Sequence, residues 1–468
     1  MYKRFEKVHF VGIGGVGMSG IAEVLKNMGY EVDGSDLRES DTTRRLRELG
    51  INISIGHKAE NVKNVHVVVI SSAVSYDNPE VGAAREMSIP VIPRAEMLAE
   101  LARLKYGILV AGAHGKTTTT SLVASVLGEG NFDPTVVIGG KLKGIGSNAK
   151  LGQGEFLVAE ADESDGSFLK LPPTIAVVTN IDREHMDYFS NIDEIKNAFL
   201  SFINKVPFYG LSILCGDNQH IKDLLPKIER RFITYGLSDG LDLVATNIRT
   251  EGLKSVFEVA LNGKSLGLFE APLIGSHNVC NCLAAIAVAN ELGIKMSVIR
   301  DALKSFSGVH RRFELKGTVS GIQVIDDYGH HPVEINATLK AAKNSIIQSS
   351  EDGKESGRLF VLFQPHRFSR TRDLLNDFFG AFTDADKIVL VDIYPAGEKP
   401  LPGINSELLF KGIKNSSKDI EYIKSRDDVL KYLSSEVKRS DTLLTLGAGD
   451  VWKMGEEFLK MKHEEYKN

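Results

Sequence analysis

Cysteine is scarce in this sequence, and long apolar runs are missing. Its 468 residues contain three cysteines, Cys215, Cys280 and Cys282, which cannot build the disulfide framework of a small secreted domain. No run approaches the roughly 20 apolar residues of a membrane-spanning helix. Lys3, Arg4 and the apolar residues after them could imitate a signal peptide, but glycines break that run, which favours a strand, a loop and a helix. We therefore expect a cytoplasmic protein that does not associate with membranes.

A strong excess of one charge is missing as well. The 56 basic and 61 acidic residues give a net charge of −5, whereas general binding to nucleic acid requires a basic surface. We therefore expect no nucleic-acid partner. Cys280 and Cys282 lie in an apolar, alanine-rich run, which favours buried thiols over a zinc site, because zinc needs about four ligands.

Short apolar strands that alternate with amphipathic helices are abundant. Residues 7–13 fit a buried strand, and residues 17–28 fit a helix. Residues 31–36 fit a second strand that ends in an acid, and residues 65–74 fit another strand with a polar end. Such alternation predicts a parallel sheet with helices on both faces. The length suggests about three domains. We expect an α/β protein whose N-terminal domain, residues 1–105, is Rossmann-like.

The pattern continues through two further predicted domains. The second, residues 106–312, has strands that end in polar residues, as in EFLVAEADESD and TIAVVTNIDREHMDYF, and we expect a P-loop-type ATPase domain. Within it, residues 231–270 have the Asn-Gly turn signal of a small extra antiparallel sheet. Residues 313–468 are expected to form a Rossmann-like C-terminal domain, with a flexible surface loop at 349–357.

The first glycine-rich loop is a candidate diphosphate site. Residues 12–17 have the pattern G-x-G-x-x-G between a predicted strand and a predicted helix, so the loop amides could approach a pyrophosphate. Asp33 and Asp36 fall near the end of the next strand, where an acid would meet a ribose. The alternative is a tight turn that binds no ligand.

The second glycine-rich loop is a shortened P-loop. Residues 112–117, GAHGKT, separate the two glycines by two residues, where the usual motif has four. Its amides and Lys116 would hold the phosphates of a nucleoside triphosphate, and Thr117 would reach Mg²⁺. The alternative is a threonine-rich helix start without a ligand.

Four carboxylates gather in EADESD, residues 160–165, at the end of a predicted strand. Bound Mg²⁺ would balance their mutual repulsion, although a solvated acidic loop is the alternative. His185 follows the next strand, where it could be a metal ligand or an ordinary polar residue.

Two polar strand ends mark the C-terminal domain, in DDYGHHP (326–332) and QPHRFSR (364–370). Arg367 and Arg370 are three residues apart and could hold a carboxylate between two guanidiniums. Ion pairs with nearby aspartates are the alternative. The two adjacent histidines of DDYGHHP do not predict a metal site, because no third ligand is evident.

Together these motifs resemble the Mur ligases of bacterial cell-wall synthesis. The resemblance rests on GIGGVGMSG, SSAV, GAHGKTTTT, EADESD, NIDREHMDYF, GSHNVCN, HRRFE, DDYGHHP, PHRFSR and LGAGD, which follow the family's order over nearly the whole chain. It implies an ATP-dependent ligase of peptidoglycan synthesis, and so of cell growth and division, with Mg²⁺ as cofactor. It further implies that L-alanine is joined to the lactyl carboxylate of UDP-N-acetylmuramate through an acyl phosphate, by a monomer or weak homodimer.

The resemblance also implies site residues. The expected catalytic residues are Lys116, Glu160 and His185, and the expected magnesium ligands are Thr117, Glu160 and His185. The expected ATP contacts are Gly112, Ala113, His114, Gly115, Lys116, Thr117, Thr118, His277, Asn278, Arg312 and Asp327. The expected UDP-sugar contacts are Gly14, Gly15, Val16, Gly17, Met18, Ser19, Asp36, Ser71, Ser72 and His114. The expected L-alanine contacts are Tyr328, His366, Arg367 and Arg370.

Three alternatives stay open. A related ligase attaches a recycled murein tripeptide to the same sugar nucleotide. The first glycine loop alone would suit an NAD-dependent dehydrogenase, but that function leaves the P-loop, the acidic cluster and the arginine pair without a role. The third alternative is a nucleotide-dependent binding switch, which would leave the polar strand ends of the C-terminal domain without a role.

Overall fold

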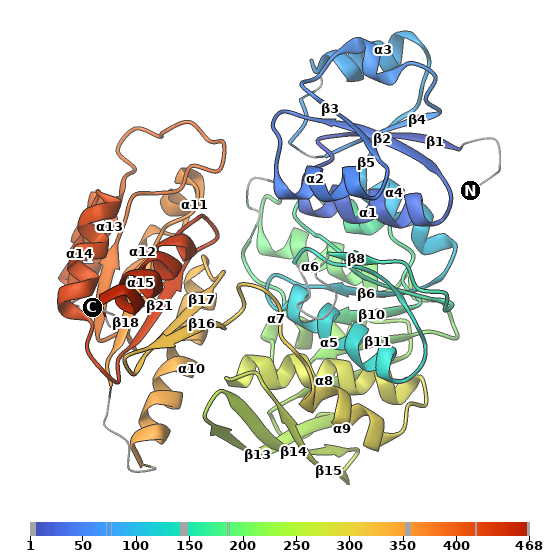
Figure 1. The fold of residues 1–468 in the computed structure, drawn as a ribbon. Coiled ribbons are helices and arrows are strands. Elements are labelled where there is room, and N and C mark those ends of the chain that lie inside the picture. The colour runs from blue at the N-terminus through green and yellow to red at the C-terminus, as the bar shows by residue number, and fades with distance from the viewer. Residues whose placement is uncertain are drawn as a thin grey trace. The chain divides into compact units, whose positions relative to one another are not determined.

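The chain was analysed as a computed structural model, which describes residues 6–71, 73–75, 77–140, 148–184, 186, 188–351, 357–416 and 419–465, without the side chains of 348–351. It divides into two compact units. Figure 1 draws the described chain with its helices and strands, coloured from the N-terminus to the C-terminus. Unit 1 comprises Met1–Thr246, Glu258–Phe269 and Cys280–Val309. Unit 2 comprises Asn247–Phe257, Glu270–Val279 and His310–Asn468.

The first sheet has five parallel strands in the order β3-β2-β1-β4-β5. Its elements are β1 (Lys7–Val11), α1 (Val16–Asn27), β2 (Glu31–Asp36), α2 (Asp41–Glu48), β3 (Asn52–Ile55), η1 (Ala59–Val62), β4 (Val67–Ile70), α3 (Pro79–Glu86), β5 (Val91–Pro93) and α4 (Arg94–Arg103). The strand order reverses between β1 and β4, and ligands of such sheets bind outside the strand ends at this point. The predicted Rossmann-like fold is confirmed, and its first glycine loop follows β1.

The second sheet lies mainly in unit 1. Its elements are β6 (Tyr106–Ala111), α5 (Lys116–Glu129), β7 (Thr135–Val137), β8 (Ala149–Lys150), β9 (Phe156–Glu160), η2 (Ser167–Lys170), β10 (Ile175–Val178), α6 (Ile192–Ile203), β11 (Leu211–Cys215), α7 (Gln219–Lys222), η3 (Leu225–Lys227), β12 (Phe232–Gly236), β13 (Leu243–Glu251), β14 (Lys254–Leu261), β15 (Lys264–Ala271), α8 (Ser276–Glu291) and α9 (Met296–Lys304). Parts of β13, β14, β15 and α8 belong to unit 2. The order is β15-β14-β13-β12-β11-β10-β6-β9-β7-β8, so the phosphate loop after β6 lies between the ends of β10 and β9.

The extra strands differ in part from the expectation for residues 231–270. The first of them, β12, pairs in parallel with β11, from Ser212 with Phe232 to Cys215 with Tyr235. The expectation of an antiparallel sheet was therefore wrong for β12. Strands β13, β14 and β15 extend the same sheet beyond β12.

Helix α1 packs on both sheets of unit 1. It contacts β2 of the first sheet and β7 and β8 of the second, and Figure 1 shows it beneath the first sheet while α3 covers the opposite face. The loop before α1 is therefore held on a helix that both sheets support.

The third sheet lies in unit 2, in the order β16-β17-β21-β18-β19-β20. Its elements are β16 (Glu314–Val319), β17 (Ile322–Asp327), α10 (Pro332–Glu351), β18 (Leu359–Phe363), α11 (Phe368–Asp373), α12 (Leu375–Gly380), β19 (Lys387–Leu390), α13 (Ser406–Asn415), β20 (Ile420–Tyr422), α14 (Arg426–Glu436), β21 (Thr442–Leu446) and α15 (Trp452–Glu465). Only β16 is antiparallel to its neighbour in the pairings described.

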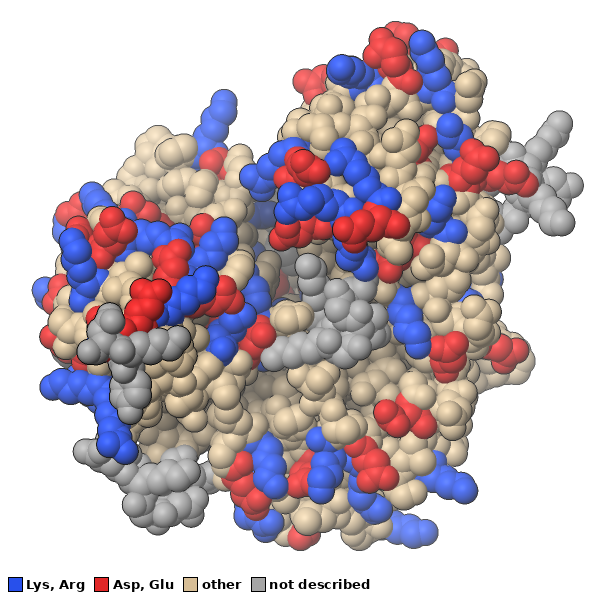
Figure 2. Space-filling model, viewed as in Figure 1, with Lys and Arg blue, Asp and Glu red and all other residues tan. Residues whose placement is uncertain are grey.

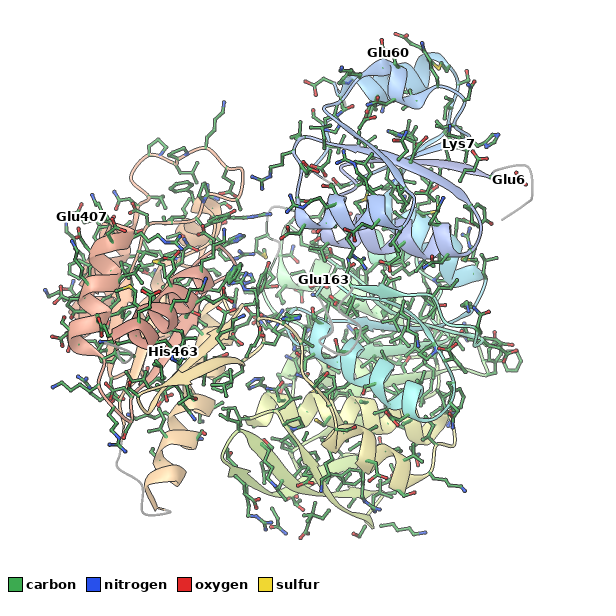
Figure 3. All side chains as sticks on the ribbon, viewed as in Figure 1. Glu6, Lys7, Glu60, Glu163, Glu407 and His463 are labelled. Carbon is green, nitrogen blue, oxygen red and sulfur yellow. The ribbon has the colours of Figure 1, made fainter. Side chains whose placement is uncertain are left out.

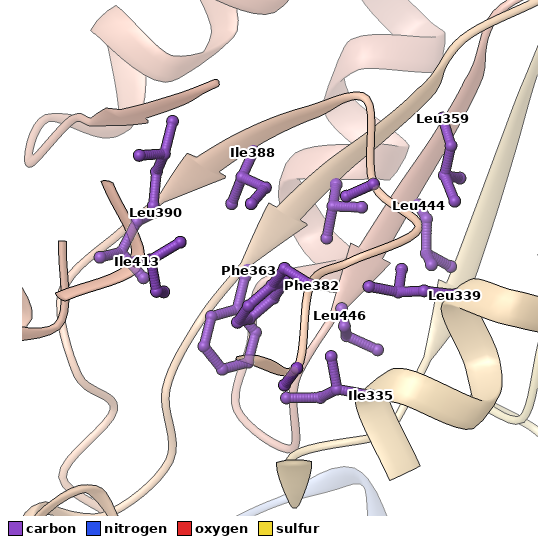
Figure 4. Packing of buried hydrophobic residues seen from close by; sticks show 14 of the residues in the cluster. Ile335, Leu339, Leu359, Phe363, Phe382, Ile388, Leu390, Ile413, Leu444 and Leu446 are labelled. Atoms are coloured by element: carbon purple, nitrogen blue, oxygen red, sulfur yellow. The ribbon is translucent and has the colours of Figure 1, made fainter. Parts of the chain in front are cut away.

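Both faces of the third sheet are buried, which explains the unbroken apolar runs of its strands. Leu359 and Phe363 of β18 pack with Leu339 of α10 and with Phe382, as Figure 4 shows. The intervening Phe360 packs in a second cluster with residues of α14 and α15. The predicted Rossmann-like C-terminal fold is confirmed.

Helix α10 is longer than the sequence predicted. Helix α10 continues to Glu351, so the prediction of a loop was wrong for residues 349–351, and residues 352–356 lie outside the described part. Basic and acidic side chains are interspersed on the surface seen in Figure 2. Among the described helices, none is both long and apolar enough to cross a membrane.

Candidate active site

The first glycine loop is fixed by β2. The Gly12 and Ile13 amides donate to the Ser35 carbonyl at 2.8 and 3.0 Å, and the Gly14 amide donates to Asp36 Oδ2 at 2.8 Å. Asp36 therefore shapes the loop. The structure gathers these predicted UDP-sugar residues in the loop after β1, in the first turn of α1 and at the ends of β2 and β4: Gly14, Gly15, Val16, Gly17, Met18, Ser19, Asp36 and Ser71. Ser72 lies outside the described residues.

Two residues that the sequence analysis missed hold this loop in place. The Asn148 amide donates to Ser19 Oγ at 3.1 Å and to the Val16 carbonyl. Arg94 lies directly against the Cα of Gly17, where a side chain would collide with its guanidinium. The same guanidinium donates to Asp162 Oδ2 at 3.1 Å. Arg94 thus connects the first glycine loop to the acidic cluster after β9.

The phosphate loop requires both of its glycines. Gly112 has φ +134° and Gly115 has φ +82°, conformations that side chains rarely adopt. A Cβ on Gly112 would lie 2.9 Å from the Asn180 carbonyl oxygen, and one on Gly115 would lie 2.7 Å from Asn281 Oδ1. Asn281 in turn accepts a 3.0 Å hydrogen bond from the Thr119 hydroxyl of α5. Neighbouring elements therefore fit closely around the loop.

The polar end of β10 holds the loop from the other side. The His114 amide donates to Asn180 Oδ1 at 2.9 Å, and its carbonyl accepts from Thr179 Oγ1 at 2.6 Å and Asn180 Nδ2 at 2.9 Å. Its ring Nε2 lies 3.4 Å from Asp182 Oδ2. The sequence analysis did not predict Thr179 and Asn180 as site residues. Their position, as a polar pair directly after a buried strand, was a signal that could have identified them.

Lys116 is held inside the site by Glu163. Its Nζ lies 2.8 Å from Oε1 and 3.0 Å from Oε2 of Glu163, and it also donates to the carbonyls of Gly112 and Ala113. Burial disfavours the charged amine, but the attraction of Glu163 and Asp162 outweighs it and raises the pKa of Lys116. Lys116 is therefore a permanent cation at the start of α5. Figure 3 labels Glu163 within this part of unit 1.

The remaining predicted residues of this region surround the same loop. Glu160 ends β9, and its Oε1 accepts the Gly139 amide at 2.6 Å. Thr117 and Thr118 lie in the first turn of α5. A carboxylate and a hydroxyl are oxygen ligands of the type that Mg²⁺ prefers. His185 lies outside the described residues.

In unit 2, Asp327 is buried at the end of β17. It accepts the Phe313 and Gly329 amides at 2.7 and 2.8 Å. Burial raises the pKa of Asp327 to about 6, against the attraction of Arg312. The Arg312 guanidinium lies 5.3 Å from the centre of the Tyr328 ring. Three predicted residues of DDYGHHP and HRRFE are thus brought together.

The other predicted residues of unit 2 form a second group at the end of β18. His366 stacks on Tyr394 with ring centres 5.7 Å apart, and its Nδ1 lies 3.2 Å from Arg370 NH1. The Arg367 amide donates to the Tyr394 carbonyl at 2.9 Å. Burial and the two arginines lower the pKa of His366 to about 4, so its imidazole is neutral at pH 7.

His277 and Asn278 begin α8 in unit 2. The Asn278 side chain donates to the Ile274 carbonyl at 2.8 Å. The His277 side chain is exposed to solvent at the start of the helix. A cavity of about 750 Å³ opens beside His277, lined also by Thr250, Asn336 and Lys340. An imidazole ring beside a cavity of this size suits a planar heterocycle.

Known proteins resemble this chain in each of its three sheets. Three family models match: "Mur ligase family, catalytic domain" over residues 7–106, "Mur ligase middle domain" over 110–289 and "Mur ligase, glutamate ligase domain" over 311–449. The UDP-N-acetylmuramate–L-alanine ligase of Desulfatibacillum aliphaticivorans is 58% identical over 460 residues, 98% of this chain and 99% of its own. The ligase of that name from Geobacter sulfurreducens is 56% identical over 466 residues, 99% of each chain.

Solved structures agree. The crystal structure of the UDP-N-acetylmuramate–alanine ligase of Thermotoga maritima matches with a TM-score of 0.82 and 30% identity, covering 98% of this chain and 99% of that one. A murein peptide ligase from Psychrobacter arcticus shares the fold, with a TM-score of 0.70 and 24% identity over 97% and 98% of the chains. With its shortened phosphate loop and acidic strand ends in the family's order, the chain belongs to the Mur ligase family.

Proposed function

We propose that this chain joins L-alanine to the lactyl carboxylate of UDP-N-acetylmuramate at the expense of ATP, as a step of peptidoglycan precursor synthesis. Relatives with this activity in their names align over 98–99% of the chain at 56–58% identity. The alternative, attachment of a murein tripeptide, has the weaker support of two solved structures, one 24% identical over 97% of this chain and one 30% identical over 65% of it.

The observation that carries the proposal is the position of Arg94. One guanidinium lies against the first glycine loop at Gly17 and donates to Asp162, whose neighbour Glu163 pairs with Lys116. A loop suited to a diphosphate and a loop suited to a triphosphate are therefore linked through three side chains of one unit. A ligase needs this arrangement, because the sugar's carboxylate must reach the terminal phosphoryl group.

The chemistry assigns a task to each charged group. A carboxylate resists attack by an amine, since it is anionic and oxide is a poor leaving group. ATP supplies the phosphoryl group that converts the carboxylate to an acyl phosphate, from which the amine of L-alanine displaces phosphate. Lys116 offsets phosphate charge in a water-poor site, and the loop amides orient the phosphates. Arg94 and Asp162 hold the two loops in register.

Mg²⁺ is part of the proposal, and the donors present fit it. Glu160 and Thr117 would hold it, with His185 as the further ligand that the resemblance implies. When bound, Mg²⁺ offsets the negative charge that the phosphates and the sugar's carboxylate bring together.

L-alanine is assigned to the group around His366 in unit 2. Arg367 and Arg370 offer guanidiniums to its carboxylate, and the neutral imidazole of His366 lies beside Arg370. Tyr328 contributes an aromatic wall. Asp327, Arg312, His277 and Asn278 are assigned to ATP.

The domain division 1–105, 106–312 and 313–468 is proposed on the same basis, as are a cytoplasmic location and a monomer or weak homodimer. The decisive experiment incubates the purified chain with UDP-N-acetylmuramate, ATP, Mg²⁺ and either L-alanine or the tripeptide. We expect phosphate release with L-alanine and a product whose mass equals the sum of sugar nucleotide and alanine less one water. Product with the tripeptide alone would overturn the substrate assignment.

A further inference from the structure

Two of the three cysteines meet at a site that the ligase chemistry does not use. Cys215 ends β11, Asp217 lies in the following turn, and Cys280 lies in the first part of α8. The two sulfur atoms and a carboxylate oxygen of Asp217 all lie within 4.8 Å of one another, and Cys280 Sγ is 4.0 Å from Asp217 Oδ2. All three residues belong to unit 1. Cys215 and Cys280, which are 65 positions apart in the sequence, therefore bring their sulfur atoms close together beside Asp217.

Several hydrogen-bond donors surround the Cys215 sulfur. Its sulfur accepts hydrogen bonds from the Cys280 thiol and from the backbone amides of Asp217 and Asn218. The buried Tyr235 hydroxyl lies beside the same sulfur. The thiolate is the form in which cysteine binds metals. Cys280 is only half-buried, which leaves a path for an ion.

We propose that Cys215, Asp217 and Cys280 form a binding site for a thiophilic divalent cation of the Zn²⁺ or Cd²⁺ type. Two sulfur ligands select such ions over Mg²⁺, which prefers oxygen. Tetrahedral zinc with Zn–S of about 2.3 Å places two sulfurs roughly 3.8 Å apart and a sulfur and an oxygen roughly 3.6 Å apart. The present spacing reaches these values with shifts of about an ångström or less. Water would fill the fourth position.

A cation here would tie three segments together. Asp217 already accepts the Leu237 and Ser238 amides at 2.6 and 3.0 Å, which fixes the turn after β12. Cys280 adjoins Asn281, whose side chain contacts Thr119 of α5. The bound ion would therefore join β11, the turn after β12 and α8, and we expect it to stabilise the protein against unfolding.

The test uses Cd²⁺, because the ultraviolet absorption band of a cadmium–thiolate bond reports only ions bound to cysteine. The full chain, reduced and freed of metal, is titrated with Cd²⁺ and then with Zn²⁺ as competitor. We expect one thiolate-bound Cd²⁺ per chain, displaced by Zn²⁺, and a higher melting temperature with Zn²⁺. Absence of the band in the wild-type protein would overturn the proposal.

The variants use the third cysteine as a matched control. Cys282 lies two residues beyond Cys280 in the same helix. It is buried and does not belong to the cluster of possible ligands, and burial raises its pKa to about 12. Cys280→Ala should weaken Cd²⁺ binding by about 100-fold or more and Asp217→Asn by about 10-fold, whereas Cys282→Ala should bind like the wild type. A band that Cys280→Ala leaves intact, or that Cys282→Ala removes, would refute the site. Circular-dichroism melting of each metal-free variant checks folding.

Discussion

Both carboxylate oxygens of Glu163 contact the Lys116 ammonium, at 2.8 and 3.0 Å. The same ammonium donates to the carbonyls of Gly112 and Ala113, so it is folded back onto its own loop. A phosphate bound to the loop must draw Lys116 at least partly away from Glu163. The ion pair between Lys116 and Glu163 therefore stabilises the nucleotide-free protein, and the bound phosphate competes with Glu163 for Lys116.

Glu163→Gln should destabilise the nucleotide-free protein. The change leaves the buried Lys116 charge without its carboxylate, which costs about 1–3 kcal/mol. In a Lys116→Met background the same change should cost little, because no buried cation remains. Thermal unfolding of the four proteins of this cycle measures the coupling. Equal losses in both backgrounds would show that the ion pair contributes nothing to stability.

Lys116→Ala should abolish most ligase activity and leave the sugar nucleotide bound. Removing one such preorganised charge typically costs about 10²- to 10³-fold in rate, and the loop at residues 12–17 does not use Lys116. Product formation by mass spectrometry and calorimetric binding of UDP-N-acetylmuramate test the two parts. Lys264→Ala, on exposed β15, is the control and should leave both unchanged. Loss of sugar-nucleotide affinity in Lys116→Ala would contradict the separate assignment of the loops.

The elements that the sequence predicted well are those whose signal is local. Mainly apolar runs of four to six residues identified β1, β4, β6, β9 and β10, because strands buried on both faces consist largely of apolar residues. The phosphate loop was found for a similar reason, since its glycines, lysine and threonine stand within six residues. The end of α10 was missed because Ser349 and Ser350 are polar, yet no glycine interrupts the sequence before Gly353.

The contacts that were missed depend on strand order. Thr179 and Asn180 reach His114 because β10 lies beside β6. The pairing of Lys116 with Glu163 requires β9 on the other side of β6. Arg94 meets Asp162 across 68 positions of sequence. No spacing rule within one segment predicts such neighbours, so the second layer of the site becomes visible only once the sheet is assembled.

The pH dependence of stability should reflect His9, which is enclosed between two carboxylates. Its Nδ1 lies 2.6 Å from Asp33 Oδ1, and its Nε2 lies 3.7 Å from Glu80 Oε2. Burial disfavours the imidazolium, but Asp33 and Glu80 raise the pKa of His9 above 6.5. Burial also opposes the Glu80 charge, yet hydrogen bonds from His9, Ser35 and Asn61 lower the pKa of Glu80 to about 2.

The two shifts act on opposite limbs of the pH profile. A raised pKa means that the His9 contribution is complete below pH 6.5 and is lost as the pH rises through the folded-state value. A lowered pKa means that the Glu80 contribution is present above pH 4.5 and is lost as the pH falls towards 2. His9→Gln should flatten the decline on the alkaline side. Melting temperatures between about pH 5 and 9 test this, with the exposed His463→Gln as control. Parallel profiles for His9→Gln and wild type would refute it.

Arg367→Ala should raise the KM for L-alanine by about 10-fold and change kcat by less than about 2-fold. The Arg367 backbone has φ +70° and donates to the Tyr394 carbonyl at 2.9 Å, so the residue is held at the start of α11 by its main chain while its side chain stays exposed to meet a substrate carboxylate. Arg372→Ala is the matched control, because Arg372 lies on the same helix and pairs with Asp373 at 2.6 Å. Initial rates at varied L-alanine, with ATP and sugar nucleotide saturating, separate the two constants. If Arg367→Ala and Arg372→Ala raise the KM for L-alanine to the same extent, a general loss of positive charge explains the effect. If Arg367→Ala leaves this KM unchanged, the carboxylate of L-alanine is bound elsewhere.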